Sequence, residues 1–205
     1  MFFATVDGMR PAPLRHNPLN ALVSPRPIAW VSTVNAQGVA NLAPYSYFNA
    51  VSAEPPYVMF APNAKVPGLP KDTWANLCEV PEFVVSLVAE RAAAAMNATS
   101  APFAPGVDEF AACGVAAAPC RLVRPPRVAE APAALECRVY RTVALPAGAD
   151  GRDSHVVIGE VVGIHLDDAL IVDGRVDERR LAPLARLGYL NYGTLGSIFA
   201  LARPG

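Results

Sequence analysis

A strand–turn–strand pattern over residues 28–42 is the strongest constraint on how this chain can fold. Ile28–Val34 is rich in β-branched and aromatic residues, which is typical of a strand. Asn35–Gly38 follows with turn-forming residues, and Gly38 can adopt a positive φ angle. Val39–Leu42 then has the composition of a returning strand. The pattern therefore predicts a β-hairpin.

The rest of the chain continues with strands in hairpin-like order. Further strands are predicted at 45–52, 57–61, 82–88, 135–145 and 155–166. Helices are predicted at 72–80, 90–97, 108–113 and 177–184, with Asp72 or Thr73 as the cap of the first. Because strands and helices do not alternate regularly, the pattern favours an antiparallel barrel with a few helices packed outside it. The sequence has no internal repeat and no clean linker, so residues 1–205 are assigned to one domain with its core at about 20–203.

Composition and charge exclude several classes of protein. The hydrophobic fraction is 53% and the mean hydropathy is +0.27, which is enough for a packed core and too much for a disordered chain. The net charge is −1 and no basic stripe is visible, so a nucleic-acid partner is not expected. No apolar run reaches about 18 residues, which argues against a membrane helix.

The four cysteines show no CxxC spacing. They are interpreted as free, mostly buried thiols in a reducing compartment, and no metal site is expected from them. No signal peptide stands out, so a cytoplasmic location is predicted. The glycine-rich fingerprints of Rossmann and P-loop sites and the GxSxG elbow of hydrolases are also absent.

Two stretches carry candidate ligand-binding groups. Asn41–Ser52 combines hydroxyl, amide and aromatic side chains on an extended segment, although an ordinary strand with polar residues facing solvent has the same composition. Lys65 and Lys71 bracket a loop, and Lys71 directly precedes Asp72, Thr73 and a predicted helix start. A lysine beside the positive end of a helix dipole suits a phosphate, but a solvated loop with a capped helix is the alternative. His155 and His165 are further candidates, each on a predicted strand where a structural or surface role is commoner.

At this point the residues support a resemblance. The segments Ser24–Thr33, Asn41–Ser52 and Pro55–Pro56 together look like the flavin reductase-like family of FMN-binding split barrels. Further similar segments follow in the same order, namely Lys71–Thr73 with Asn76, Met96–Ser100, Asp108–Phe110, Gly159–Val162 and Arg186–Gly188. Each segment alone is weak, but their combination in sequence order is specific.

The resemblance implies a mainly β protein with some α structure. Its fold would be a six-stranded Greek-key split β-barrel with peripheral helices, forming a homodimer with FMN in a groove at the interface. The flavin would be lined by residues on two strands, namely Trp30, Val31, Ser32 and Thr33, and Ser46, Tyr47, Phe48, Asn49, Ala50 and Val51. Lys71, Asp72 and Thr73 would lie near the phosphate. Tyr189 and Tyr192 stand in a stretch that varies in the family.

The function implied is NAD(P)H-dependent flavin reduction, with hydride passing from NADH or NADPH to N5 of FMN. No side chain needs to act as an acid or base in that step, and His155 is the one residue placed on the nicotinamide side. Reduced flavin would feed a partner such as a flavin-dependent monooxygenase. The alternative is an FMN-binding electron carrier reduced by a partner protein. A third reading, a split barrel that holds haem or a deazaflavin, is disfavoured because the only histidines beyond the entry segment are His155 and His165.

Overall fold

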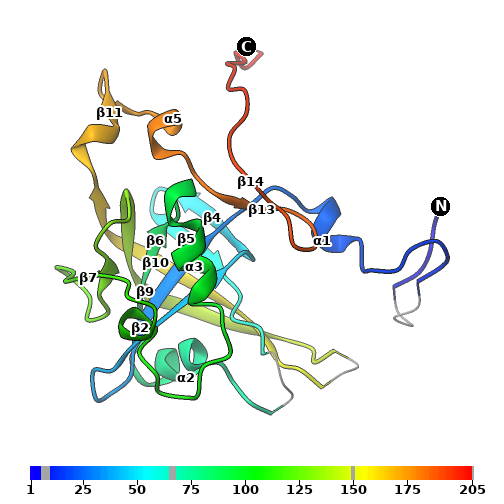
Figure 1. The fold of residues 1–205 in the computed structure, drawn as a ribbon, viewed down its shortest axis with the longest axis horizontal. Helices are drawn as coiled ribbons and strands as arrows, with labels where there is room; N and C mark the ends of the chain where they lie inside the picture. The colour runs from blue at the N-terminus through cyan, green and yellow to red at the C-terminus, as the bar shows by residue number, and fades with distance from the viewer. Residues whose placement is uncertain (6–9, 65–67, 149–150, 205) are drawn as a thin grey trace.

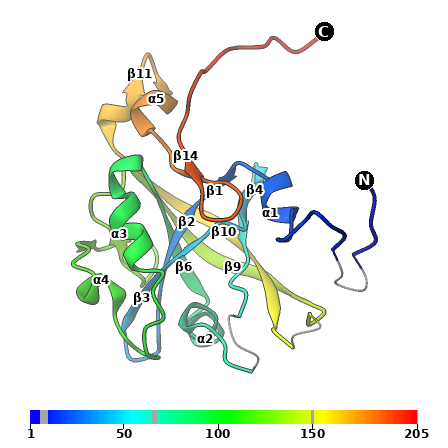
Figure 2. The same cartoon turned by 45° about the vertical axis from the view of Figure 1, so that its right-hand side comes forward.

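The computed structural model describes residues 1–5, 10–64, 68–148 and 151–204. At its centre is a seven-stranded antiparallel sheet in the order β3-β2-β6-β9-β10-β5-β4 (Figures 1 and 2). The strands of this sheet are β2 (Ala29–Val34), β3 (Ala40–Tyr45), β4 (Phe48–Ala53), β5 (Pro56–Phe60), β6 (Glu82–Leu87), β9 (Ala133–Leu145) and β10 (Ser154–Leu166). The strand-by-strand prediction also has seven, whereas the resemblance implied a six-stranded barrel.

The connection between β3 and β4 shows why the sheet curls. The two strands lie at opposite ends of the sheet order, yet only Ser46 and Tyr47 separate them in the chain. The step from Tyr45 to Phe48 spans at most about 10 Å. The two edges of the sheet must therefore approach each other here, which produces a split barrel rather than a flat sheet. The continuous strand expected at 45–52 is wrong in this respect, because the chain bends at Ser46–Tyr47 before β4 begins.

The remaining elements are short. Small sheets are formed by β1 (Arg26–Pro27), β13 (Ala185–Arg186) and β14 (Tyr192–Gly193), by β7 (Ala117–Ala118) and β8 (Arg127–Val128), and by β11 (Ile171–Val172) and β12 (Arg175–Val176). The helices are α1 (Leu19–Leu22), α2 (Asp72–Glu79), η1 (Glu90–Ala92), α3 (Ala93–Ala98), α4 (Glu109–Ala112), η2 (Asp168–Leu170) and α5 (Glu178–Leu181). No helix in the described part of the chain is long and apolar enough to cross a membrane.

The predicted hairpin is confirmed. β2 and β3 pair from Ala29↔Tyr45 to Val34↔Ala40, and Gly38 has the positive φ, 87°, that the turn requires. The last predicted helix is too long, because Ala182 adopts a left-handed conformation and Pro183 cannot continue the helix. Buried apolar residues form three clusters in the described part of the chain, and Phe60 and Phe83 are in contact in the one that includes residues of β2, β5 and β6.

The prediction that Asp72 or Thr73 caps α2 is wrong. Lys71 occupies the N-cap position, with no side-chain cap bond. The Asp72 carboxylate instead accepts a hydrogen bond from the backbone N–H of Gly106, at 3.0 Å. The Thr73 side chain is fully buried and turned toward the barrel.

Candidate functional site

A cavity of about 240 Å³ lies where the end of β3, the start of α2 and the segment after α3 meet. One wall is formed by Pro44 and Tyr45, and the opposite wall by apolar residues of the 101–105 segment. The polar groups that line it come from these three parts of the chain and from α4: Asn41, Lys71, Asp72, Thr73, Ser100 and Glu109. The cavity thus combines an apolar surface with a cation, hydroxyl groups and carboxylates.

A buried chain of hydrogen bonds holds the floor of the cavity. The Tyr45 hydroxyl donates to Thr73 Oγ1 at 2.8 Å, and Thr73 Oγ1 donates to Asn41 Oδ1 at 2.7 Å. Asn41 Nδ2 lies 2.9 Å from both carboxylate oxygens of Glu109, which also accepts from the backbone N–H of Leu42 at 2.8 Å. The chain ties α2, β3 and α4 together, so a change in any one element is transmitted to the cavity lining.

The ionisable groups around the cavity differ in their surroundings. The Lys71 ammonium lies 4.6 Å from the centroid of the Tyr45 ring, a cation–π contact at the N-cap of α2. Burial raises the pKa of the Tyr45 phenol well above its ordinary value, so the hydroxyl stays protonated and keeps donating to Thr73. Burial also raises the pKa of Glu109, and hydrogen bonds from the Leu42 backbone and the Asn41 amide oppose that rise. The cavity is therefore lined by the Lys71 ammonium at the helix start and by the buried carboxyl group of Glu109.

Among the predicted residues, the structure brings Lys71, Asp72 and Thr73 to this cavity. It does not bring the side chains of β2 there. Trp30 is 2% exposed and its indole N–H donates to Thr99 Oγ1 at 2.9 Å, while Ser32 donates to the backbone carbonyl of Pro126. Val31 is fully buried in the barrel core, and Thr33 lies behind the cavity, bonded to Asn76 Nδ2 at 3.0 Å. These four side chains support the site from the interior rather than line the cavity.

The block from Ser46 to Val51 follows Tyr45 along the edge of the sheet, and none of its residues lines the cavity. Phe48 turns into the core, whereas Tyr47 is 43% exposed and Val51 is 56% exposed. Asn49 and Ala50 are also exposed on β4. The Tyr47 hydroxyl donates to Asn20 Oδ1 at 2.8 Å and so ties this edge to α1. The block therefore presents an open polar and aromatic surface directly after Tyr45 in the chain.

The other candidates lie apart from the cavity lining. The His155 ring stacks on the Trp74 indole with 3.9 Å between ring centroids, one residue beyond Thr73 on α2. His165 contacts Glu136 instead. Tyr189 is half-exposed near His16, and the Tyr192 ring lies beneath the guanidinium of Arg186. Lys65 lies outside the described residues.

Comparison with known proteins identifies the family. The flavin reductase-like domain family matches residues 22–182. The chain belongs to the flavin reductase-like family. A relative from Deinococcus radiodurans is 42% identical over 87% of this chain and 79% of its own length. The structure of nitrilotriacetate monooxygenase component B from Bacillus cereus is 35% identical and superposes with a TM-score of 0.84 over 94% of this chain and all of that chain. A split barrel domain protein from Shewanella frigidimarina, at 22% identity, has a TM-score of 0.81 over the whole of both chains and supports the fold.

Sequence reasoning missed part of what this flavin reductase-like chain places in the cavity. Asn41, Ser100 and Glu109 all lie in segments that carried the resemblance, but Asn41 was considered only as the start of the 41–52 stretch, and Ser100 and Glu109 were assigned no site role. Glu109 is the clearest omission, because a carboxylate that is only 6% exposed must have partners. The acidic pair Asp108 and Glu109 at a predicted helix start was the available signal. Asp108 caps α4, which leaves Glu109 free to turn inward.

Proposed function

We propose that this protein is an NAD(P)H-dependent flavin reductase that binds FMN. The observation that carries the proposal is the contact of the Lys71 ammonium with the Tyr45 ring at the cavity, directly before the Ser46–Val51 block in the chain. A cation at a helix start suits the phosphate of FMN, and the aromatic, amide-bearing edge suits its ring and ribityl chain.

The residues present fit such a ligand in two parts. The cavity, at about 240 Å³, is smaller than the 300–1,000 Å³ typical of small-molecule sites. It is therefore assigned to the phosphate end, with Lys71 supplying charge and Ser100 supplying a hydroxyl. The remainder of the ligand is assigned to the open surface formed by Ser46, Tyr47, Asn49 and their neighbours on β4. The β2 residues Trp30–Thr33 contribute by holding Thr99 and the network behind Asn41 in place.

Bound FMN would supply two-electron redox chemistry, with NADH or NADPH as the proposed hydride donor to its N5. The residues of the chain position the flavin and the nicotinamide. Lys71 fixes the anionic end, and the buried Tyr45–Thr73–Asn41 chain fixes the wall against which the ligand lies. Stacking on Trp74 keeps the His155 ring in one orientation, where it is the proposed nicotinamide-side group. Holding both reactants in one geometry is the main contribution expected of the protein.

A homodimer is part of this proposal. The segment Thr194–Pro204 is exposed throughout and leaves the body of the molecule (Figures 1 and 2). Its Phe199 and Leu201 are 75% and 83% exposed, and Leu22 on α1 is 77% exposed beside the β4 edge. Exposed apolar groups of this kind mark association surfaces. A second copy seated on α1 and β4 would cover them and complete the open part of the flavin site.

The test is anaerobic mixing of the purified protein with FMN and then with NADH or NADPH, followed at the nicotinamide and flavin absorption bands. Flavin-dependent oxidation of either nicotinamide supports the proposal. A protein that retains FMN through purification but oxidises neither nicotinamide would be the electron carrier reduced by a partner protein. Failure to bind FMN at all would refute both functions. A flavin-dependent monooxygenase as acceptor of the reduced flavin is tested by adding one to the same reaction.

A further inference from the structure

We propose that Cys120, Glu136 and His165 form a binding site for a divalent cation of the zinc class. One ligand atom from each residue, the Cys120 Sγ, a Glu136 carboxylate oxygen and a His165 ring nitrogen, lies within 4.8 Å of the other two. The cluster shares no residue with the cavity lining, so this proposal does not depend on the proposed flavin site.

The fold brings the three residues together from distant parts of the chain. Glu136 on β9 pairs with Gly163 on β10, and His165 lies two residues further along β10. Their side chains therefore share one face of the sheet as diagonal neighbours. Cys120 comes from the segment between β7 and β8 that packs over this face. The expectation of no metal site rested on the spacing of cysteines along the sequence, which cannot register a site assembled across two strands and a loop.

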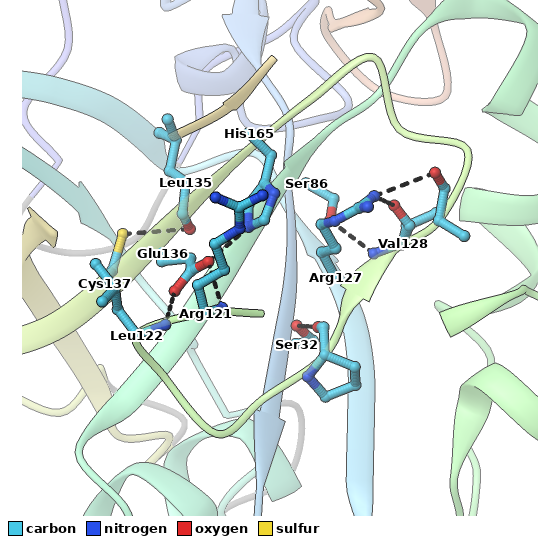
Figure 3. A network of polar contacts seen from close by, with 12 residues as sticks. Ser32, Ser86, Arg121, Leu122, Arg127, Val128, Leu135, Glu136, Cys137 and His165 are labelled. Carbon is cyan, nitrogen blue, oxygen red and sulfur yellow. Dashed lines mark hydrogen bonds and ion pairs between the residues drawn. The ribbon is translucent and has the colours of Figure 1, made fainter. Parts of the chain in front are cut away.

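The donor set is chemically suited to zinc. Thiolate sulfur, imidazole nitrogen and carboxylate oxygen are the three ligand types that zinc accepts in proteins. The Glu136 carboxylate is 1% exposed and is held by the backbone N–H groups of Arg121 and Leu122, at 2.9 and 2.6 Å (Figure 3). Metal-ligating carboxylates are commonly oriented by such outer hydrogen bonds. A buried carboxylate that is oriented in this way can bind a cation with little rearrangement.

The geometry lies close to that of a bound ion. Zinc bonds of about 2.0–2.3 Å in a tetrahedral site place ligand atoms about 3.3–3.6 Å apart. The His165 Nε2 to Glu136 Oε1 separation is 2.5 Å and must open by about 1 Å, and the widest pair, at up to 4.8 Å, must close by a similar amount. Because backbone N–H groups hold the Glu136 carboxylate, these movements fall to the Cys120 and His165 side chains. The His165 side chain is 22% exposed, which gives an ion access from solvent, and the thiol proton of Cys120 is released on binding.

Bound metal would fasten the 119–127 segment to the β9–β10 pair. Three protein ligands leave a fourth position for water. The role that follows is structural, because the cluster lies outside the cavity and outside the β4 surface. Addition of the ion should therefore raise the melting temperature of the wild-type protein without being required for flavin binding.

Cobalt titration of the chelator-treated full-length protein tests the site. A thiolate-to-cobalt charge-transfer band that saturates at one equivalent, and that zinc removes, is the expected result. Cys120→Ser should abolish the band, and His165→Ala should weaken cobalt binding by at least about tenfold. Cys113→Ser, which removes a free cysteine outside the cluster, is the matched control and should behave as wild type.

Either of two results would overturn the site. One is the absence of a thiolate band in the wild-type protein at stoichiometric cobalt. The other is a band of equal intensity in Cys120→Ser, which would place the bound ion elsewhere. Zinc-dependent stabilisation is measured in parallel, and an equal shift in melting temperature for wild type and Cys120→Ser would count against the site in the same way.

Discussion

Replacing Lys71 with Ala is expected to weaken FMN binding much more than riboflavin binding. Lys71 is the N-cap residue of α2 and lines the cavity, where a phosphate would gain both its charge and the positive end of the helix dipole. Two unit charges about 4 Å apart near a protein surface attract by about 4 kcal/mol before desolvation and screening are subtracted. A charge-assisted hydrogen bond contributes about 1–3 kcal/mol after those subtractions, which corresponds to a 5- to 150-fold weaker Kd for FMN.

Riboflavin supplies the internal comparison because it lacks the phosphate. Quenching of flavin fluorescence measures both affinities with the same protein samples, at low and at high salt. The FMN preference of the wild-type protein should shrink as salt rises, since the interaction is partly exposed. Lys71→Arg keeps the charge and is the conservative control. Lys71→Ala also removes the contact with the Tyr45 ring, so the melting temperature of each variant is recorded to separate lost binding from lost stability.

Equal losses of affinity for FMN and riboflavin in Lys71→Ala would refute the assignment. Such a result would show that the lysine shapes the cavity wall through Tyr45 and does not hold the phosphate. A salt-independent FMN preference in the wild-type protein would point to the same conclusion, because it would remove the electrostatic origin of that preference.

Three further outcomes follow from the buried network and the exposed segment. Thr73→Val removes the hydroxyl that joins Tyr45 to Asn41, and urea denaturation should show a loss of about 1–3 kcal/mol; an unchanged midpoint would contradict the role of the network. Burial raises the pKa of Glu109, so the folded state holds the carboxyl proton more tightly than the unfolded state. The contribution of this proton to stability is therefore complete below the pKa of the unfolded state, and it is lost as the pH rises through the pKa of the folded state. Glu109→Gln should therefore lose less stability than the wild-type protein as the pH rises above the ordinary pKa of a glutamate, and a steeper loss would contradict the predicted direction. The wild-type protein should have the mass of the proposed homodimer in light scattering, and Phe199→Ser combined with Leu201→Ser should give the mass of a monomer. An unchanged mass would show that this segment does not hold two copies together.

The strands were predictable because their signals are local. The β2–β3 hairpin needs only a β-branched run, a turn and a second run, all within residues 28–42. The role of the β2 side chains was not predictable in the same way. All six residues of β2 are buried, so the strand shows no alternation that would reveal which side faces a ligand. The resemblance assigned all of residues 30–33 to the flavin. In the structure, three side chains of β2 instead form hydrogen bonds with Thr99, Pro126 and Asn76.

The cavity was less predictable because its contacts span the chain. Asn41 and Glu109 are 68 residues apart, and Trp30 and Thr99 are 69 apart. No local pattern links such pairs, and only the curling of the sheet brings them together. The Cys120–Glu136–His165 cluster has the same origin, since the β9–β10 register and the covering segment jointly place its members.

The start of α2 shows how three consecutive residues with one predicted role acquire different ones. Successive side chains on a helix point about 100° apart, so a single ligand cannot be met equally by all three. The Thr73 hydroxyl turns inward and completes the buried network, and the Asp72 carboxylate accepts from Gly106 on the far side of the loop. Lys71 alone of the three projects over the Tyr45 ring at the cavity. The negative charge of Asp72 is thereby directed to the Gly106 backbone, so the anion binding proposed for this site rests on Lys71 and on the network that fixes the wall beneath it.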